Sequence, residues 1–261
     1  MSKIISIHSF RGGTGKSNIS SNVSAQLAKL GHRVGVVDTD INSPGIHVLF
    51  GMAEDDIDKT LNDYLWDRCA IEQAAYDVSN RVAKGEIAAA GGQLYLIPSS
   101  MNVGEITRIL RDGYDVGFLS DGLRDLVEKL DLDYLVIDTH PGLNDETLLS
   151  IAISDILIII LRTDQQDFQG TAVTVDIARK LDVPHLYLTI NKAIAFYAHD
   201  NYKSLLEQMK ETYAAPVAAI LPLSEDIAAL QSSSLFSFRL PPDHPAVKAI
   251  HNIVACVVAA D

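Results

Sequence analysis

One stretch near the N-terminus decides the fold of this 261-residue chain: Ser9-Phe10-Arg11-Gly12-Gly13-Thr14-Gly15-Lys16-Ser17. A β-branched apolar run over residues 3–8 precedes it, and Ile19, Val23 and Leu27 follow at helical spacing. A strand, a glycine-rich loop and a helix are the arrangement that a phosphate-binding loop requires. Backbone N–H groups turn toward a polyphosphate there, and the helix N-terminus adds its positive end. The stretch therefore predicts a nucleotide site, and the alternative is an ordinary glycine turn.

The side chains of this loop are expected to contact different parts of the nucleotide and its metal ion. We expect Lys16 to place its charge on the β- and γ-phosphates and Ser17 to offer its hydroxyl to Mg²⁺. The remaining contacts to the nucleotide are predicted to come from Gly12, Gly13, Thr14, Gly15 and Asn18.

Two later strands end in acidic residues. Residues 33–38 are predicted to be a buried strand that ends in Asp38, and Asp40 follows two positions later. Residues 134–138 form a second such strand, in which an apolar run ends in Asp138 as in a Walker B sequence. Carboxylates at strand ends beside a phosphate loop suit Mg²⁺ and an attacking water, although the first pair could instead cap the next helix.

Two further strand ends bear on the base of the nucleotide. The strand predicted over residues 185–190 is followed by Asn191, whose amide can donate to and accept from the edge of adenine. A guanine site would want an aspartate at position 194, where this chain has Ile194, so adenine is favoured. The strand over residues 217–221 ends at Pro222, which we expect on the other side of the base.

Composition argues against several other classes of protein. The net charge of −13 disfavours non-specific binding to nucleic acid and anionic lipid. Cys69 and Cys256 lie far apart in sequence, which indicates a reducing compartment and argues against zinc or iron–sulfur ligation within one chain. The first residues already form a strand rather than a signal peptide, and the apolar runs at 156–161 and 253–260 are far shorter than the roughly 20 residues of a membrane span. We expect a soluble, cytoplasmic protein.

Strands alternate with helices along the whole chain, and no Pro/Gly/Ser-rich linker divides it. This pattern predicts a single α/β domain over residues 1–261, with a doubly wound, mostly parallel sheet and helices on both faces. The stretch from 54 to 92 is the least clear part. There we predict a short helix at 61–66, a longer one over 71–82, and a turn or irregular loop over 84–92.

The compressed glycine loop behind a basic residue resembles the deviant Walker A loop of the MinD/ParA family. The D-x-D of Asp38 and Asp40 and the D-x-x-P-G over 138–142 are similar to its switch I and switch II. The resemblance covers essentially the whole chain and implies a P-loop NTPase fold. It further implies an ATPase that binds ATP and Mg²⁺, hydrolyses ATP slowly, dimerises around two ATP molecules and responds to a stimulating protein partner.

The same resemblance implies roles for single residues. Asp40 would orient the lytic water, Asp38 would lie near the metal, and the backbone N–H of Gly142 would meet the γ-phosphate. Arg11 stands where the family carries a lysine that crosses the dimer interface to the partner's nucleotide, and an arginine there keeps the charge. The alternative is a solvated arginine at the edge of the loop. His140 is expected to form a local hydrogen bond and receives no catalytic role.

The function implied is an ATP-dependent homodimeric switch used in positioning or partitioning a cargo inside the cell. Residues 250–261 carry no Lys or Arg, so we expect core packing there rather than a C-terminal membrane anchor. Metal-cluster carriers of related fold need paired cysteines, which the spacing of Cys69 and Cys256 does not provide. An ATP-dependent small-molecule ligase or synthetase of related fold remains the alternative.

Overall fold

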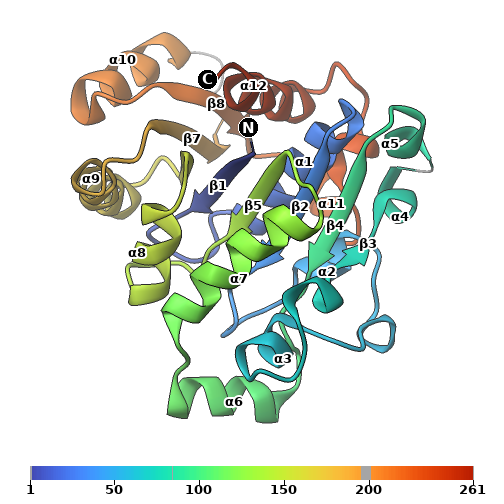
Figure 1. Ribbon diagram of the computed structural model, residues 1–261. Coiled ribbons are helices and arrows are strands. Elements are labelled where there is room, and N and C mark those ends of the chain that lie inside the picture. The colour runs from blue at the N-terminus through green and yellow to red at the C-terminus, as the bar shows by residue number, and fades with distance from the viewer. Residues whose placement is uncertain (1, 84, 195–200, 261) are drawn as a thin grey trace.

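Eight strands form one sheet in the computed structural model, which describes residues 2–83, 85–194 and 201–260 (Figure 1). In sheet order the strands are β3 (Tyr76–Asp77), β4 (Gln93–Ile97), β2 (Arg33–Asp38), β5 (Tyr134–Asp138), β1 (Lys3–His8), β6 (Ile156–Leu161), β7 (His185–Ala193) and β8 (Val217–Pro222). The edge strand β3 runs antiparallel to β4, and the other pairs are parallel. The predicted doubly wound, mostly parallel sheet is confirmed.

Helices cover both faces of this sheet (Figure 1). One face packs against α1 (Lys16–Lys29), α2 (Ile46–Leu49), α4 (Ser79–Ala83), α5 (Glu86–Ala89), α11 (Glu225–Ala229) and α12 (Pro245–Ala259). The other packs against α3 (Leu61–Leu65), α6 (Val103–Asp112), α7 (Val116–Lys129), α8 (Asp145–Ala152), α9 (Gln165–Lys180) and α10 (Tyr202–Tyr213). Short 3₁₀ helices are η1 (Glu54–Asp56), η2 (Ile71–Ala74) and η4 (Phe236–Phe238).

Burial on both faces explains why the strands are continuous apolar runs. In β6 the side chains alternate between two clusters: Ile156 and Ile158 pack with α1 and α12, and Leu157 and Ile159 pack on the side of α8 and α9. All these side chains are fully buried. A strand with two buried faces lacks the polar alternation of a half-exposed strand, so its sequence is a continuous apolar run.

The strand order decides where the site forms. β1 lies between β5 and β6, and β2 lies on the other side of β5. The register pairs Ile7 with Asp138 and Asp38 with Asp138. Because these strands are parallel, the loops that follow β1, β2 and β5 emerge together at one edge of the sheet. The glycine-rich loop and both acidic loops therefore meet.

The stretch from 54 to 92 departs from prediction in two places, while the short helix near 61–66 is confirmed as α3. The single helix predicted over 71–82 is wrong: the chain forms η2, the edge strand β3 and α4. Tyr76 pairs with Leu96 in the sheet, and its hydroxyl bonds the backbone at Lys59, so tertiary pairing overrides helix formation. Within the predicted loop over 84–92, α5 forms around the fully buried Ile87; Lys84 lies outside the described residues.

Candidate nucleotide-binding site

A buried ion pair lies at the base of the glycine-rich loop. Lys16, the first residue of α1, places Nζ 3.0 Å from Oδ1 of Asp138 at the end of β5. Ser20 lies one turn further along α1, and its hydroxyl donates to the same oxygen at 2.8 Å. The Lys16 side chain is 6% exposed and that of Asp138 1%, so each charge depends on the other for compensation. Ser20 was not predicted, although its i+4 spacing from Lys16 is visible in the sequence.

The second oxygen of Asp138 suits a cation. Oδ2 is buried, with no hydrogen-bond partner among the described residues. The neighbouring Asp38 carboxylate is also buried and accepts backbone N–H groups of Asp40 and Gly45. Burial and the charge of Asp138 raise the pKa of Asp38 to about 7. A hard cation takes carboxylate and hydroxyl oxygens, so these two carboxylates and the Ser17 hydroxyl fit Mg²⁺.

Protein side chains alone do not complete a metal site. Across the part of the chain that the structure describes, no cluster of three or more His, Cys, Asp or Glu residues is placed to hold a metal ion. Phosphate oxygens would have to supply the remaining ligands, as they do for Mg²⁺ in nucleotide sites.

A polar cavity of about 200 Å³ lies over the loop. Its lining contains most of the predicted nucleotide contacts together with residues from three loops: Ser9, Gly12, Gly13, Thr14, Gly15, Lys16, Ser17, Asn18, Asp40 and Pro141. Gly13 has φ +76° and Gly15 has φ +91°, a left-handed backbone that glycine adopts without strain. The sequence motif thus has the concave shape that a polyphosphate requires.

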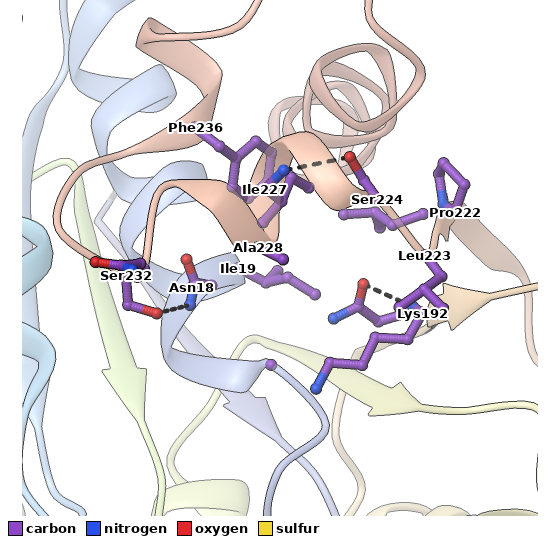
Figure 2. Close-up of a pocket in the computed structure, with 14 residues that line it drawn as sticks. Asn18, Ile19, Lys192, Pro222, Leu223, Ser224, Ile227, Ala228, Ser232 and Phe236 are labelled. Carbon is purple, nitrogen blue, oxygen red and sulfur yellow. Dashed lines mark hydrogen bonds between the residues drawn. The ribbon is translucent and has the colours of Figure 1, made fainter.

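A second cavity, of about 340 Å³ (Figure 2), shares the lining residues Gly15 and Asn18 with the first. Gly15, Asn18 and Asn191 line it together with Pro222, and α11 and the turn after it close one side. The apolar side chains labelled in Figure 2 include Ile19, Leu223, Ile227, Ala228 and Phe236. An apolar slot with a few polar groups is typical of a site for a flat organic ring. The structure therefore brings the two residues predicted for the base, Asn191 and Pro222, to one cavity.

Asn191 supports the glycine-rich loop in this structure. Its Nδ2 donates to the Thr14 carbonyl at 2.7 Å, and its Oδ1 accepts the backbone N–H of Lys192. A Cβ atom on Gly15 would lie 2.4 Å from that Nδ2, so this approach needs glycine. Lys192 adds a bond of 2.8 Å from Nζ to the Gly13 carbonyl. Lys192 was not predicted, although its place directly after Asn191 near a strand end was visible in the sequence.

Two predicted phosphate-sensing groups have partners within the chain. The N–H of Gly142, at φ +89°, donates to the Ser9 carbonyl at 3.2 Å. Arg11 is 40% exposed and pairs with Asp164 at 3.4 Å and with Asp167 at 3.6 Å. The single N–H of Gly142 must give up its bond to contact a phosphate, whereas both ion pairs of Arg11 involve Nη1, one of its three guanidinium nitrogens. The acidic pair at the start of α9, the N-cap Asp164 and Asp167, was not foreseen, because its distance from Arg11 in sequence hides the contact.

Histidines occupy two positions around the loops. The ring Nδ1 of His140 lies 2.7 Å from Oδ1 of Asp40, and this hydrogen bond raises the pKa of His140. His140 is thus hydrogen-bonded, but its partner lies 100 positions away in sequence rather than in its own loop. His8, fully buried at the end of β1, contacts Thr139 through Nδ1 at 2.9 Å. Burial, reinforced by the charge of Lys16, lowers the pKa of His8 to about 3.

Two features outside the site concern membrane spans and the two cysteines. No helix among the described residues is both long and apolar enough to cross a membrane. Cys69 packs with the side chains beneath α3 and α7, whereas Cys256 belongs to α12 on the opposite face of the sheet. The two free thiols are therefore separated by the sheet.

Comparisons with known proteins agree with this geometry. The family model of the AAA domain matches residues 2–194. An uncharacterized ATP-binding protein of Methanocaldococcus jannaschii is 25% identical over 260 residues, which cover 100% of this chain and 89% of that protein. An iron–sulfur cluster carrier protein of Pyrococcus furiosus is 25% identical over 265 residues (97% and 85%). The septum site-determining protein MinD of Synechocystis sp. is 25% identical over 229 residues (87% and 78%).

Solved structures share the fold. The MinD protein of Pyrococcus horikoshii, complexed with Mg-ADP, matches with a TM-score of 0.78 and 20% identity, covering 99% of this chain and 97% of that one. A chain of the MinC:MinD cell division protein complex of Aquifex aeolicus matches with a TM-score of 0.79 and 18% identity, covering 98% and 96%. With its deviant glycine loop, its two acidic strand ends and the matched domain, the chain belongs to the MinD/ParA family of P-loop ATPases.

Proposed function

We propose that this chain is an ATP-dependent molecular switch, which binds Mg²⁺ and ATP, hydrolyses ATP slowly and forms a homodimer when ATP is bound. Residues 1–261 would act as one domain. The observation that carries the proposal is the buried pair of Lys16 and Asp138: Lys16 lines the polar cavity over the glycine loop, and Oδ2 of Asp138 has no hydrogen-bond partner among the described residues. A charge cluster of this kind is costly to bury unless a ligand uses it.

The two cavities divide the nucleotide between them. The polar cavity would hold the phosphates on the backbone of the loop, with Lys16 neutralising the β- and γ-phosphates. The apolar cavity would take adenine between Asn191 and Pro222. Mg²⁺ would be held by Ser17 and Asp138, with Asp38 close by, and would supply charge neutralisation on the phosphates.

Hydrolysis would need little chemistry from the protein. The oxygen of a water forms a bond to the γ-phosphorus while the bond to the β,γ-bridging oxygen breaks. One proton of the water passes to a phosphate oxygen, which gives ADP and inorganic phosphate. Asp40 lines the polar cavity and would orient this water. Gly142 would report the γ-phosphate by exchanging its bond to Ser9 for one to a phosphate oxygen.

Dimerisation would complete the site. Arg11 is partly exposed at the edge of the glycine-rich loop. Its ion pairs with the carboxylates of Asp164 and Asp167 are long, at 3.4 and 3.6 Å. A polyphosphate on a second copy of the chain offers a guanidinium two parallel charge-assisted hydrogen bonds, which would favour exchange. Such a switch stays in its ATP state until a partner protein stimulates it. The MinC:MinD complex supports a protein partner by analogy.

The biological role would be positioning or partitioning of a cargo in the cytoplasm. Widely separated free cysteines are compatible with that reducing compartment. Some relatives are named iron–sulfur cluster carriers, but Cys69 and Cys256 lie on opposite faces of this sheet, which disfavours that role here. Hydrolysis that required an added small acid or amine would instead indicate a ligase.

Calorimetry with ATP and Mg²⁺ tests this proposal. Lys16→Ala should abolish measurable ATP binding, because it removes the charge on the β- and γ-phosphates and leaves Asp138 unpaired. Lys29→Ala is the matched control, since Lys29 lies on the same helix in a surface pair with Glu86. Thermal unfolding of both variants checks that they fold. Near wild-type affinity in Lys16→Ala would refute the site, and tighter binding of GTP than ATP would refute the role of Asn191.

A further inference from the structure

The contact between His140 and Asp40 joins the two loops that the proposed switch depends on. Asp40 follows β2 and His140 follows β5, and these strands are neighbours in the sheet. An ionised carboxylate only accepts hydrogen bonds, so the ring donates from Nδ1 to Oδ1 across 2.7 Å. This distance is that of a short, strong, charge-assisted bond.

Backbone bonds hold both ends of the contact. The N–H of Asp40 donates to Asp38 at 3.1 Å, and its carbonyl accepts the N–H of Ser43. The carbonyl of His140 accepts the hydroxyl of Thr147 on α8 at 3.3 Å. The exposed fraction is 24% for the His140 side chain and 15% for that of Asp40. The imidazole therefore has a defined position from which to act on the carboxylate.

The carboxylate of Asp40 needs such a partner. Among the described residues, His140 is the side chain that hydrogen-bonds this carboxylate, and the other hydrogen bonds of Asp40 are made by its backbone. Without the ring, the carboxylate would rotate over several orientations beside the polar cavity. With Oδ1 occupied, Oδ2 is left to accept a hydrogen bond from a water.

We propose that His140 is a positioning residue for ATP hydrolysis, which holds Asp40 so that its second oxygen orients the attacking water and which ties the two loops into one unit. This inference rests on the proposed function. His140 does not touch the reacting atoms and acts through Asp40. Misplacement of a catalytic group by about 1 Å can cost on the order of 100-fold in rate, so loss of this bond should lower kcat by roughly 10- to 100-fold.

Steady-state kinetics separates this role from a structural one. His140→Ala should lower kcat while KM and the ATP dissociation constant stay within about twofold, because Asp40 acts on the water rather than on binding. His140→Asn carries an amide donor at the position of Nδ1 and should restore part of kcat. His251→Ala, at an exposed position on α12, should leave kcat unchanged.

A double-mutant cycle shows whether the effect passes through Asp40. Asp40→Ala should lower kcat, and adding His140→Ala should then lower it no further. Additive losses, or a wild-type kcat in His140→Ala, would overturn the inference while leaving ATP hydrolysis intact. A rise in KM with unchanged kcat would do the same. A wild-type protein that does not hydrolyse ATP would overturn the proposed function and this inference together.

Discussion

At the scale of single residues, the buried His8 beside the site makes the stability of the fold depend on pH. Its Nδ1 contacts the Thr139 hydroxyl, whose own proton goes to the Ile7 carbonyl, so Nδ1 is the donor in this contact. The other ring nitrogen is buried with no hydrogen-bond partner among the described residues. Burial disfavours the protonated ring and the nearby charge of Lys16 adds to this effect, so the pKa of His8 is lowered to about 3.

This pKa predicts acid sensitivity of folding. The unfolded chain takes up a proton on His8 near pH 6.5, whereas the native protein does so only near pH 3. The contribution of His8 to the free energy of unfolding is thus fully present above pH 6.5. It falls as the pH drops toward 3, by up to about 5 kcal/mol. His8→Asn keeps a donor to Thr139 and cannot titrate. Denaturant unfolding between pH 7 and 4 should show that the free energy of unfolding falls less with pH in His8→Asn than in the wild type or the His251→Asn control. An equal fall in all three proteins would contradict this role of His8.

Sequence reasoning identified the residues with a known chemical pattern and missed those defined by contact. Lys16, Asp40 and Asp138 stand out because their motifs need those residue types at those spacings. The link from His140 to Asp40 spans 100 positions, and no local pattern records it. Lys192 lacks a motif of its own, although a lysine at a strand end beside the phosphate loop was visible.

At the scale of elements, α9 holds the glycine-rich loop in place. Asp164, its N-cap, accepts the N–H of Asp167 and pairs with Arg11. Further along α9 the ring of Phe10 lies against Gly170. A Cβ atom added to Gly170 would come 2.2 Å from Cδ1 and 2.7 Å from Cβ of Phe10. The absence of a side chain at Gly170 therefore lets the loop dock on the helix.

This docking predicts an unusual response to alanine. Gly to Ala within a helix gains roughly 1 kcal/mol from propensity alone. At Gly170 the added methyl group overlaps Phe10, and overpacking costs about 1–3 kcal/mol, so Gly170→Ala should lower the free energy of unfolding. In a Phe10→Ala background the same substitution should be neutral or stabilising. Denaturant unfolding of the four proteins measures this coupling, and a stabilised Gly170→Ala in the wild-type background would contradict the docking.

Elements with one strong signal were predictable, and those that depend on neighbours were not. The strands other than β3, together with α1, follow from apolar runs and helical spacing. The helix predicted over 71–82 failed because Tyr76 is drawn into an edge strand beside β4. Pairing with a strand far along the chain is a tertiary effect, which outweighs the local helical pattern.

At the scale of the whole molecule, the sheet order creates the site. β1, β2 and β5 are separated in sequence and adjacent in space, and their parallel direction brings three loops to one edge. Alternating strands and helices predicted the fold class but not this order. The open rim of the site, with Arg11 and the polar cavity, is then the surface where a second copy would meet the nucleotide.

Arg11 variants test how the two copies would engage. Arg11→Ala should still bind ATP as a monomer, because its guanidinium contacts Asp164 and Asp167 rather than the cavity, but it should lose the dimer. Arg11→Lys keeps the charge and should preserve dimerisation in part. An Arg11→Ala protein that dimerises like wild type would leave Arg11 with its role inside its own chain.

The most direct measurement is sedimentation of the wild-type protein with Mg²⁺ and a slowly hydrolysed ATP analogue, compared with Mg²⁺ and ADP. We expect a monomer with ADP and a dimer with the analogue, since the γ-phosphate is the group that Gly142 and the partner's Arg11 would recognise. Identical sedimentation with the two nucleotides, at concentrations that calorimetry shows to saturate the site, would contradict an ATP-dependent homodimeric switch.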